Sequence, residues 1–390
     1  MKIIFFTHPD FLHHQSMPRF ANMLAKGMEH RGHDVSLWMP KPIFVRLSNI
    51  KTIKKWLGYI DQYIIFPIKI KSQLNKIAND TLFVFCDHAL GPWIPLVSNR
   101  AHIIHCHDFL AQQSALGQIP QNPTGFTGKV YQKFIQKGYN KGKNFISVSQ
   151  KTKNDLSYFL RKPALSSTVV YNGLNRVFAP KPKVETRELL SKYLGSNIKG
   201  GYILHVGGNQ WYKNRLGVIE IYDAWRAYYK RDLPLILLGE KPNDILLSRK
   251  KLSEFKDDII FLSGVDDEFV DKFYAAASVF LFPSLAEGFG WPIAEAMASK
   301  SLVITTNEAP MNEVALDAGF YIKIMPSLTE KIIEWANESS HVLERVLSLS
   351  SKERSAFELK GLENAKRFDQ KDALDSIEKI YLQILDQENK

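Results

Sequence analysis

The sequence predicts an α/β fold with two doubly wound parallel sheets, one in each half of the chain. Short apolar runs alternate with amphipathic helical segments, a pattern typical of parallel sheets covered by helices. The alternation is interrupted at the Pro- and Lys-rich segment 179–185 and then begins again. At 390 residues, the chain is also too long for one ordinary α/β core and suits two domains.

The first half begins with a strand and continues in alternation. A helix is expected over 18–30, with its apolar residues on one face, and Gly32 ends it. Ser149 is the expected N-cap of a helix that runs to Phe159. The predicted strands of this half are 3–6, 34–39, 82–86, 102–105, 144–148 and 168–171.

The second half repeats the pattern. The predicted strands are 202–206, 235–238, 259–262, 279–282 and 302–305, and the predicted helices are 216–229, 268–276 and 292–298. A last amphipathic helix is expected over 371–386. We therefore expect an N-terminal domain, 1–180, on which this last helix packs, and a C-terminal domain, 181–370. Two such sheets facing each other leave a cleft at the carboxyl ends of their strands.

The composition is that of a soluble globular enzyme, with 45% hydrophobic and 23% charged residues. The two cysteines, Cys86 and Cys106, lie in apolar strand-like runs, which favours buried free thiols in a reducing compartment. The N-terminal apolar run is too short for a secretory signal, and no uncharged stretch approaches the roughly 18 residues that span a bilayer. These features predict a cytoplasmic protein.

The net charge of +11 favours anionic partners, such as a nucleotide diphosphate or an acidic lipid surface. The segment 51–76 stands out because it mixes lysines with Trp56, Tyr59, Tyr63 and Phe66. Lysine beside interfacial aromatics is the composition of a membrane-surface segment, which would make the protein peripheral on the inner face of a membrane. The alternative is a helix that packs its apolar side on the sheet and keeps its lysines in water.

The most informative stretch is 282–300, FPSLAEGFGWPIAEAMASK, in which a strand, a glycine loop and a helix follow one another. Pro292 suits the first turn of a helix, and backbone N–H groups of such a loop bind anions and hydroxyls. Glu287 lies in the loop and Glu295 lies one turn into the helix. One carboxylate can therefore meet a sugar while the other reaches further along a bound nucleotide. The alternative is two ordinary surface acids beside a tight turn.

The spacing of Glu287 and Glu295 resembles the E-x7-E signature of the GT-B glycosyltransferases of family 4, the glycosyl transferases group 1. Shorter matches follow in family order at 31–33, 147–149, 171–173, 312–314 and 317–319, so the resemblance covers nearly the whole chain. It implies two Rossmann-like domains facing a central cleft. It also implies a retaining, hexosyltransferase-like transfer from a nucleoside-diphosphate sugar, without a metal or another cofactor, in surface polysaccharide or glycolipid assembly.

The resemblance implies roles for single residues as well. Glu287 would hold the donor sugar, Glu295 would bind the ribose hydroxyls, and Lys213 would stabilise the departing diphosphate as a point charge. The backbone groups expected around the donor are those of Gly207, Gly208, Gly288, Phe289 and Gly290. The alternative for Lys213 is a solvated loop lysine.

Two places depart from the family pattern. Many members carry an arginine directly after the loop's glycine, whereas Gly208 stands there; Arg215 is nearby but matches no family position, so the second cation stays open. The N-terminal loop, HHQSMP at 13–18, differs from the paired-glycine turn of many relatives. Because this loop frames the acceptor in the family, the resemblance does not identify the acceptor.

His107 and Asp108 follow a predicted strand, at the sheet edge that would face the cleft. An imidazole beside a carboxylate can carry acid–base chemistry. The resemblance implies that His107 contacts the donor sugar near the reacting centre. His102, His105 and His107 alternate along a strand and offer no zinc spacing, so no metal site is expected.

Other functions stay open on sequence alone. They are another GT-B enzyme, such as a nucleotide-sugar epimerase or a phosphorylase, a non-catalytic nucleotide binder, and a basic nucleic-acid-binding protein. No nucleic-acid recognition module is evident, so nucleic acid is not expected as a partner. The expected partners are a UDP- or GDP-sugar and a carbohydrate or lipid-linked acceptor.

Overall fold

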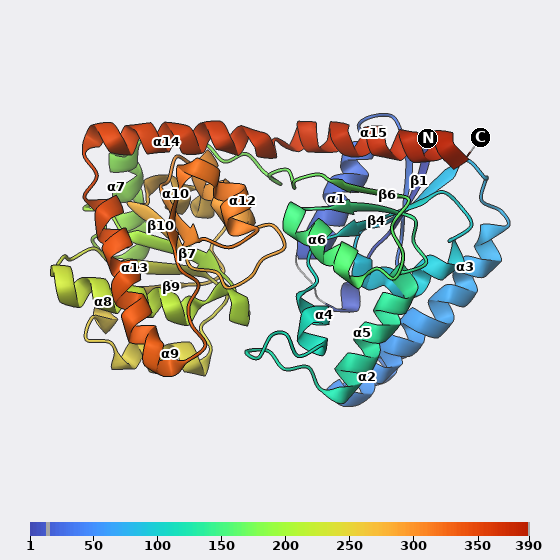
Figure 1. Cartoon of the computed structure of the whole chain (residues 1–390), viewed down its shortest axis with the longest axis horizontal. Helices are drawn as coiled ribbons and strands as arrows, with labels where there is room; N and C mark the ends of the chain where they lie inside the picture. The colour runs from blue at the N-terminus through green and yellow to red at the C-terminus, as the bar shows by residue number, and fades with distance from the viewer. Residues whose placement is uncertain (13–15, 389–390) are drawn as a thin grey trace. The chain divides into compact units, whose positions relative to one another are not determined.

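The computed structural model describes residues 1–12 and 16–388 and contains two compact units (Figure 1). The first unit holds Met1–Asn175 together with the C-terminal segment that begins at Gln370, and the second unit holds Arg176–Asp369. Each unit contains a six-stranded parallel sheet. The expected acceptor loop includes residues 13–15, which lie outside the described residues.

The segment 179–185, predicted as a linker, lies inside the second unit and contains a helix start. Lys183 opens α7 (Lys183–Leu194), and Pro182 precedes it. Proline is tolerated at this place because the first N–H groups of a helix have no intrahelical partner. Lys183 Nζ donates to Glu358 Oε1 at 2.6 Å, which ties the helix start to its own unit.

The sheet of the first unit has the order β2-β1-β3-β4-β5-β6, with all pairs parallel. The chain leaves β1 to form β2 on one side and later β3 on the other, so strand order reverses between β1 and β3. β3 and β4 are buried along their whole length, as expected between two layers of helices. The strands are β1 (Lys2–Phe6), β2 (Asp34–Trp38), β3 (Thr81–Phe85), β4 (His102–Cys106), β5 (Asn144–Ser147) and β6 (Ser166–Val169). Strand β6 begins and ends two residues earlier than predicted.

The C-terminal helix packs on this first sheet. The Tyr381 hydroxyl lies 2.7 Å from His105 Nε2 on β4, and Arg31 Nη2 donates to Asp375 Oδ1 at 2.5 Å. Ser149 caps its helix, as predicted, by accepting from the Thr152 N–H. The helices of the unit are α1 (Ser16–Glu29), α2 (Lys51–Ile60), α3 (Phe66–Leu74), α4 (Leu110–Ala115), α5 (Phe126–Tyr139), α6 (Gln150–Phe159) and α15 (Gln370–Glu388).

Residues 51–74 form one helical segment, in which a π-helical turn, η3 (Asp61–Ile65), joins α2 to α3. Phe66 and Ile70 are buried in the core of the unit. Phe66 is therefore not an exposed interfacial aromatic, and the packed-helix alternative holds for this side of the segment. The reason is the helical period, which turns α3 so that these two residues face the sheet.

The sheet of the second unit has the order β12-β11-β10-β7-β8-β9, the arrangement of dinucleotide-binding folds. Strand order reverses between β7 and β10. The strands are β7 (Ile203–Gly207), β8 (Leu235–Gly239), β9 (Ile259–Leu262), β10 (Val279–Phe282), β11 (Val303–Thr306) and β12 (Gly319–Ile322). The edge strand β12 was not predicted, because its four residues alternate in burial and follow a helix of only five.

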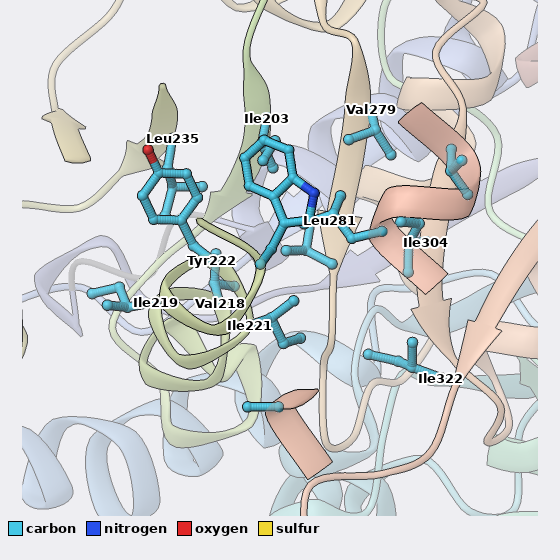
Figure 2. Packing of buried hydrophobic residues seen from close by; sticks show 14 of the residues in the cluster. Ile203, Val218, Ile219, Ile221, Tyr222, Leu235, Val279, Leu281, Ile304 and Ile322 are labelled. Atoms are coloured by element: carbon cyan, nitrogen blue, oxygen red, sulfur yellow. The ribbon is translucent and has the colours of Figure 1, made fainter. Parts of the chain in front are cut away.

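The core of the second unit forms where α8 and α13 pack on the sheet. Figure 2 shows Val218 and Tyr222 of α8 among the strand residues Ile203, Leu235 and Leu281. The helices are α7, α8 (Arg215–Tyr229), α9 (Asp244–Leu252), α10 (Asp267–Ala276), α11 (Trp291–Ala298), α12 (Met311–Ala315), α13 (Ile332–Leu347) and α14 (Ser351–Ala365). Within the described residues of the chain, no helix combines the length and apolar character needed to cross a bilayer.

Candidate functional site

Lys213 and Glu287 meet at the carboxyl edge of the second sheet, where strand order reverses. A short helical turn, η5 (Trp211–Lys213), follows β7, and the glycine loop follows β10. Lys213 Nζ donates to both carboxylate oxygens of Glu287, at 2.8 and 3.0 Å. Only 14% of the lysine side chain and 8% of the glutamate side chain are exposed. Ligands of open α/β sheets bind at such reversals, so the pair lies where a ligand is expected.

Hydrogen bonds hold the two loops together around this pair. The Ser284 hydroxyl lies 2.8 Å from Glu287 Oε1 and 2.7 Å from the Tyr212 carbonyl oxygen. The Leu285 N–H also donates to that carbonyl, at 2.7 Å. Lys213 Nζ lies 5.2 Å from the centre of the Phe282 ring, within cation–π range. The ammonium and the carboxylate are therefore fixed from several directions before any ligand binds.

Glu295 lies on α11, and Tyr274 of α10 orients it. The Tyr274 hydroxyl donates to Glu295 Oε2 at 2.8 Å. Burial raises the pKa of the Glu295 carboxyl, and the hydrogen bond from Tyr274 and the positive charges of Arg176 and Lys213 act against this rise. Lys213 therefore acts electrostatically on Glu295 as well as pairing with Glu287, and the three predicted side chains occupy one region of the second unit.

Glycines shape both strand ends. Gly290 takes φ 98° at the N-cap of α11, a conformation that L side chains rarely adopt. A Cβ on Gly239 would lie 2.1 Å from the Gly207 carbonyl oxygen, and one on Gly208 would lie 2.4 Å from the Gln210 side chain. The predicted loop residues Gly288 and Phe289 precede Gly290, and the Phe289 ring packs 5.3 Å from that of Phe368. The backbone strands can therefore lie close together at the ends of β7 and β8, and the loop before α11 can turn sharply, because no side chain stands in the way.

Arg215 does not extend into the loop as a second free cation. It is buried, and its Nη1 donates to Asn209 Oδ1 at 2.6 Å and to the Glu240 carbonyl oxygen at 3.0 Å. Burial lowers its pKa to about 10, so it stays protonated at neutral pH. The Asn209 N–H donates in turn to Glu240 Oε2 at 3.0 Å. Arg215 therefore ties the loop after β7 to the end of β8.

His107 lies in the first unit, directly after β4. Its Nε2 donates to the Cys86 carbonyl oxygen at 2.9 Å, and its ring meets Phe20 edge to face at 4.5 Å. Burial lowers the pKa of His107, so the imidazole is neutral near pH 7. Because Nε2 carries the proton, Nδ1 is the acceptor of the neutral ring. Burial raises the pKa of the neighbouring Asp108 carboxyl.

The first unit contains a second polar pair that was not predicted from the sequence. His8 follows β1 and Asp87 follows β3, and His8 Nε2 lies 2.9 Å from Asp87 Oδ2, with both residues buried. His88 Nδ1 lies 3.0 Å from the other carboxylate oxygen. The signal that could have found this pair is a polar residue two positions after the end of each of two neighbouring strands. Over residues 1–12 and 16–388, no group of three or more His, Cys, Asp or Glu side chains is placed to hold a metal ion.

Two family models match successive parts of this chain. The model described as Glycosyltransferase Family 4 matches residues 17–177, and that described as Glycosyl transferases group 1 matches residues 200–338. The first match falls in the first unit except for its last two residues, and the second falls in the second unit. Glu287, Glu295 and Lys213 all lie within the second match.

Curated relatives align with part of their length. The O-antigen chain mannosyltransferase B of Escherichia coli is 28% identical over 239 residues, which are 61% of this chain and 60% of that relative. The O-antigen chain mannosyltransferase RfbU of Salmonella typhimurium is 27% identical over 251 residues, 64% of this chain and 62% of the relative. The aligned part thus spans about six tenths of each relative.

Solved structures match nearly the whole chain. HepE of Anabaena, in complex with UDP and glucose, gives a TM-score of 0.69 at 16% identity and covers 97% of this chain and 99% of its own. WaaG, a glycosyltransferase involved in lipopolysaccharide biosynthesis, gives 0.67 at 17% identity with the same coverage. These likenesses establish the fold. The two family models, which together match most of the chain, show that it belongs to the family 4 glycosyltransferases, and its fold is their two-domain GT-B fold.

Proposed function

We propose that this protein is a retaining glycosyltransferase that moves a sugar from a nucleoside-diphosphate sugar to an acceptor. The observation that carries the proposal is the Lys213–Glu287 pair at the strand reversal of the second sheet. An ammonium group fixed there can stabilise the charge that develops on a departing diphosphate. The carboxylate beside it can accept hydrogen bonds from sugar hydroxyls. Membership of the family supports this assignment.

In the proposed reaction, the bond between the anomeric carbon and the diphosphate oxygen breaks, and the acceptor hydroxyl oxygen bonds to that carbon. The hydroxyl proton leaves with the diphosphate. Lys213 offsets the diphosphate charge, Glu287 holds the sugar together with backbone N–H groups near Gly290, and Glu295 accepts from the ribose hydroxyls.

The relatives' names suggest which substrates to test first. Both are O-antigen mannosyltransferases, so we infer that a hexose such as mannose is transferred from a UDP- or GDP-sugar. We infer further that the acceptor is a carbohydrate or a lipid-linked glycan in polysaccharide or glycolipid assembly. The protein would act in the cytoplasm, as a peripheral protein at the inner face of the membrane.

Thermal unfolding in the presence of nucleotide-sugars tests the donor assignment. A ligand that binds only the folded state stabilises it by about 2.7 kcal/mol at a hundredfold excess over Kd. We expect GDP-mannose or a UDP-hexose to raise Tm, and the Glu295→Ala variant to lose the shift. A donor that raises Tm is then assayed for release of its nucleoside diphosphate with a lipid-linked glycan acceptor. Epimerisation of the donor without any acceptor would overturn the transferase assignment.

We propose that transfer needs no metal, because Lys213 supplies positive charge where a divalent ion would otherwise bridge the diphosphate. Turnover should therefore persist in excess EDTA. A loss of turnover on chelation that magnesium or manganese restores would contradict this part of the proposal. Donor binding measured by calorimetry with and without EDTA separates a metal needed for binding from one needed only for transfer.

A further inference from the structure

A continuous series of aromatic contacts joins α2 and η3 to α5 in the first unit. The ring centroids of Trp56 and Tyr59 lie 5.6 Å apart, and Tyr59 stacks on Tyr131 at 5.5 Å. The Tyr63 hydroxyl lies 2.6 Å from that of Tyr131, and the Tyr63 ring lies 5.4 Å from that of Phe134. Both ends of the series reach solvent, since Trp56 is 57% exposed and Phe134 is 45% exposed. The helical segments, side by side in Figure 1, therefore form one surface.

This surface carries exposed apolar and exposed basic side chains that repeat at the same interval along the helix. On α5, exposed apolar and basic residues each recur every four positions, which places each set on one helix face. The apolar set is Phe126, Val130 and Phe134, and the basic set is Lys129, Lys133 and Lys137. The neighbouring segment exposes Ile53, Trp56, Ile64 and Ile68, with Lys55, Lys69 and Lys71 exposed among them. We call these exposed residues the α2–α5 face.

The orientation of α5 is fixed by backbone contact on its other side. A Cβ on Gly138 would lie 2.1 Å from the Gly91 carbonyl oxygen, and one on Gly91 would lie 2.3 Å from the Ile135 carbonyl oxygen. Gly91 belongs to η4 (His88–Leu96), a buried turn of the same unit. Only glycine permits this approach, so α5 is held with its apolar and basic stripes outward.

The charge of the face is of one sign. The ranges 41–76 and 126–143 contain a single acid, Asp61. Asp61 is buried, and its carboxylate accepts from the N–H groups of Ile43, Phe44 and Val45 at 2.9–3.1 Å. The Asp61 carboxylate is therefore hydrogen-bonded to backbone groups below the surface. The face presents lysines and apolar side chains with no acid between them.

We propose that the α2–α5 face docks on an anionic phospholipid bilayer. Lysines attract the anionic headgroups, while Trp56 and the isoleucine and phenylalanine side chains enter the boundary of the acyl region. A protein partner would be expected to match the lysines with acids at fixed positions, whereas a bilayer needs only their density. The proposal refines the peripheral location in the proposed function and assigns the contact to two helical segments, with Tyr63 and Phe66 supporting the face from below.

Flotation with vesicles tests the proposal on the full-length protein without donor or acceptor. We expect binding to vesicles of mixed phosphatidylcholine and phosphatidylglycerol, no binding to phosphatidylcholine alone, and a loss of binding at high salt. Replacing Lys129, Lys133 and Lys137 by Gln should weaken binding on the order of 100-fold, at about 1 kcal/mol per lysine. The matched control replaces the exposed Lys251, Lys256 and Lys331 of the second unit and should leave binding unchanged.

A single apolar substitution separates insertion from simple charge attraction. Phe126 is 82% exposed, so Phe126→Ala removes no buried contact and should weaken vesicle binding about tenfold. Leu252→Ala, at a residue 80% exposed in the second unit, is the control. Equal binding by both lysine triples, or no binding to anionic vesicles at low salt, would overturn the proposal. Donor-dependent Tm shifts measured on the same proteins report on the proposed function independently.

Discussion

Both sheets reverse their strand order beside their first strand, β1 or β7, yet they place different pairs at the reversal. In the first unit, His8 after β1 meets Asp87 after β3. In the second unit, Lys213 after β7 meets Glu287 after β10. Each pair joins a base and an acid across neighbouring strand ends, at the position where open α/β sheets bind ligands. The fold thus supplies the same geometric position twice, and the residues decide what chemistry occupies it.

The pairs differ in how their charge is set. A lysine supplies a compact point charge that can offset a diphosphate, whereas an imidazole carries charge only when it is protonated. Burial alone would raise the pKa of the Asp87 carboxyl, but hydrogen bonds and charge from His8 and His88 hold it well below its usual range. In the first unit the charge of the acid is thus held by two imidazoles, whereas in the second unit a lysine pairs with the acid.

The largest effect is expected for Lys213→Met. The substitution leaves the Glu287 carboxylate buried without its cation, so the free energy of unfolding should fall by about 3 kcal/mol. Transfer should fall about 100- to 1,000-fold, because the fixed positive charge is lost. The double variant Lys213→Met/Glu287→Gln should regain most of the stability but none of the activity. Urea unfolding and turnover measured on all three proteins check this, and a stable Lys213→Met protein would show that the pair contributes little.

Glu295→Ala sharpens the assignment within the second unit. Loss of the Glu295 carboxylate should weaken binding of the nucleotide-sugar donor by about 1.5–3 kcal/mol, the range for a hydrogen bond to a charged group. Stability should change less, because Glu295 is only partly buried, although its removal takes away the acceptor of the Tyr274 hydroxyl. Calorimetry with the donor and with its free nucleoside diphosphate checks the assignment. Equal losses for both ligands place the contact on the nucleotide, and unchanged affinity for both would remove Glu295 from the site.

Asp87→Asn tests whether the first pair is held by charge. Because the folded-state pKa of Asp87 is depressed, its carboxylate stabilises the protein above the unfolded-state pKa of about 3.9, and this contribution is lost as pH falls through the folded-state pKa. We expect Asn to cost about 2 kcal/mol near neutral pH. The difference from the unaltered protein should shrink below about pH 4. A difference that does not change with pH in denaturant unfolding would assign the pair to packing rather than charge.

The same comparison shows how much the sequence could predict. The alternation of strands and helices predicted both sheets, and the motif from Phe282 to Lys300 predicted Glu287 and Glu295, because strand, loop and helix are contiguous there. Lys213 followed from a family position. The His8–Asp87 pair could not be found this way, since 79 residues separate its members and only the strand order brings them together. The part of α5 in the proposed docking face was not predicted for a similar reason, because the glycine contact between α5 and η4 is visible only in three dimensions.

The smallest effect is expected for Tyr274→Phe, which removes the hydrogen bond to Glu295 but keeps the ring that fills the core. Burial already raises the pKa of Glu295, and the tyrosine hydroxyl opposes that rise, so its loss should raise the pKa further. A carboxyl group that is protonated at higher pH accepts fewer hydrogen bonds from ribose. The Kd for the nucleotide-sugar should therefore increase a fewfold at neutral pH, which corresponds to roughly 0.5–1.5 kcal/mol, and it should increase more at pH 5.

Tyr202→Phe is the matched control, because that buried hydroxyl donates to the Phe273 carbonyl oxygen at 2.7 Å. If both variants lose the same affinity with the same pH dependence, the effect is a general loosening of the core. If only Tyr274→Phe shows a loss that grows as pH falls, the hydroxyl sets the ionisation of Glu295.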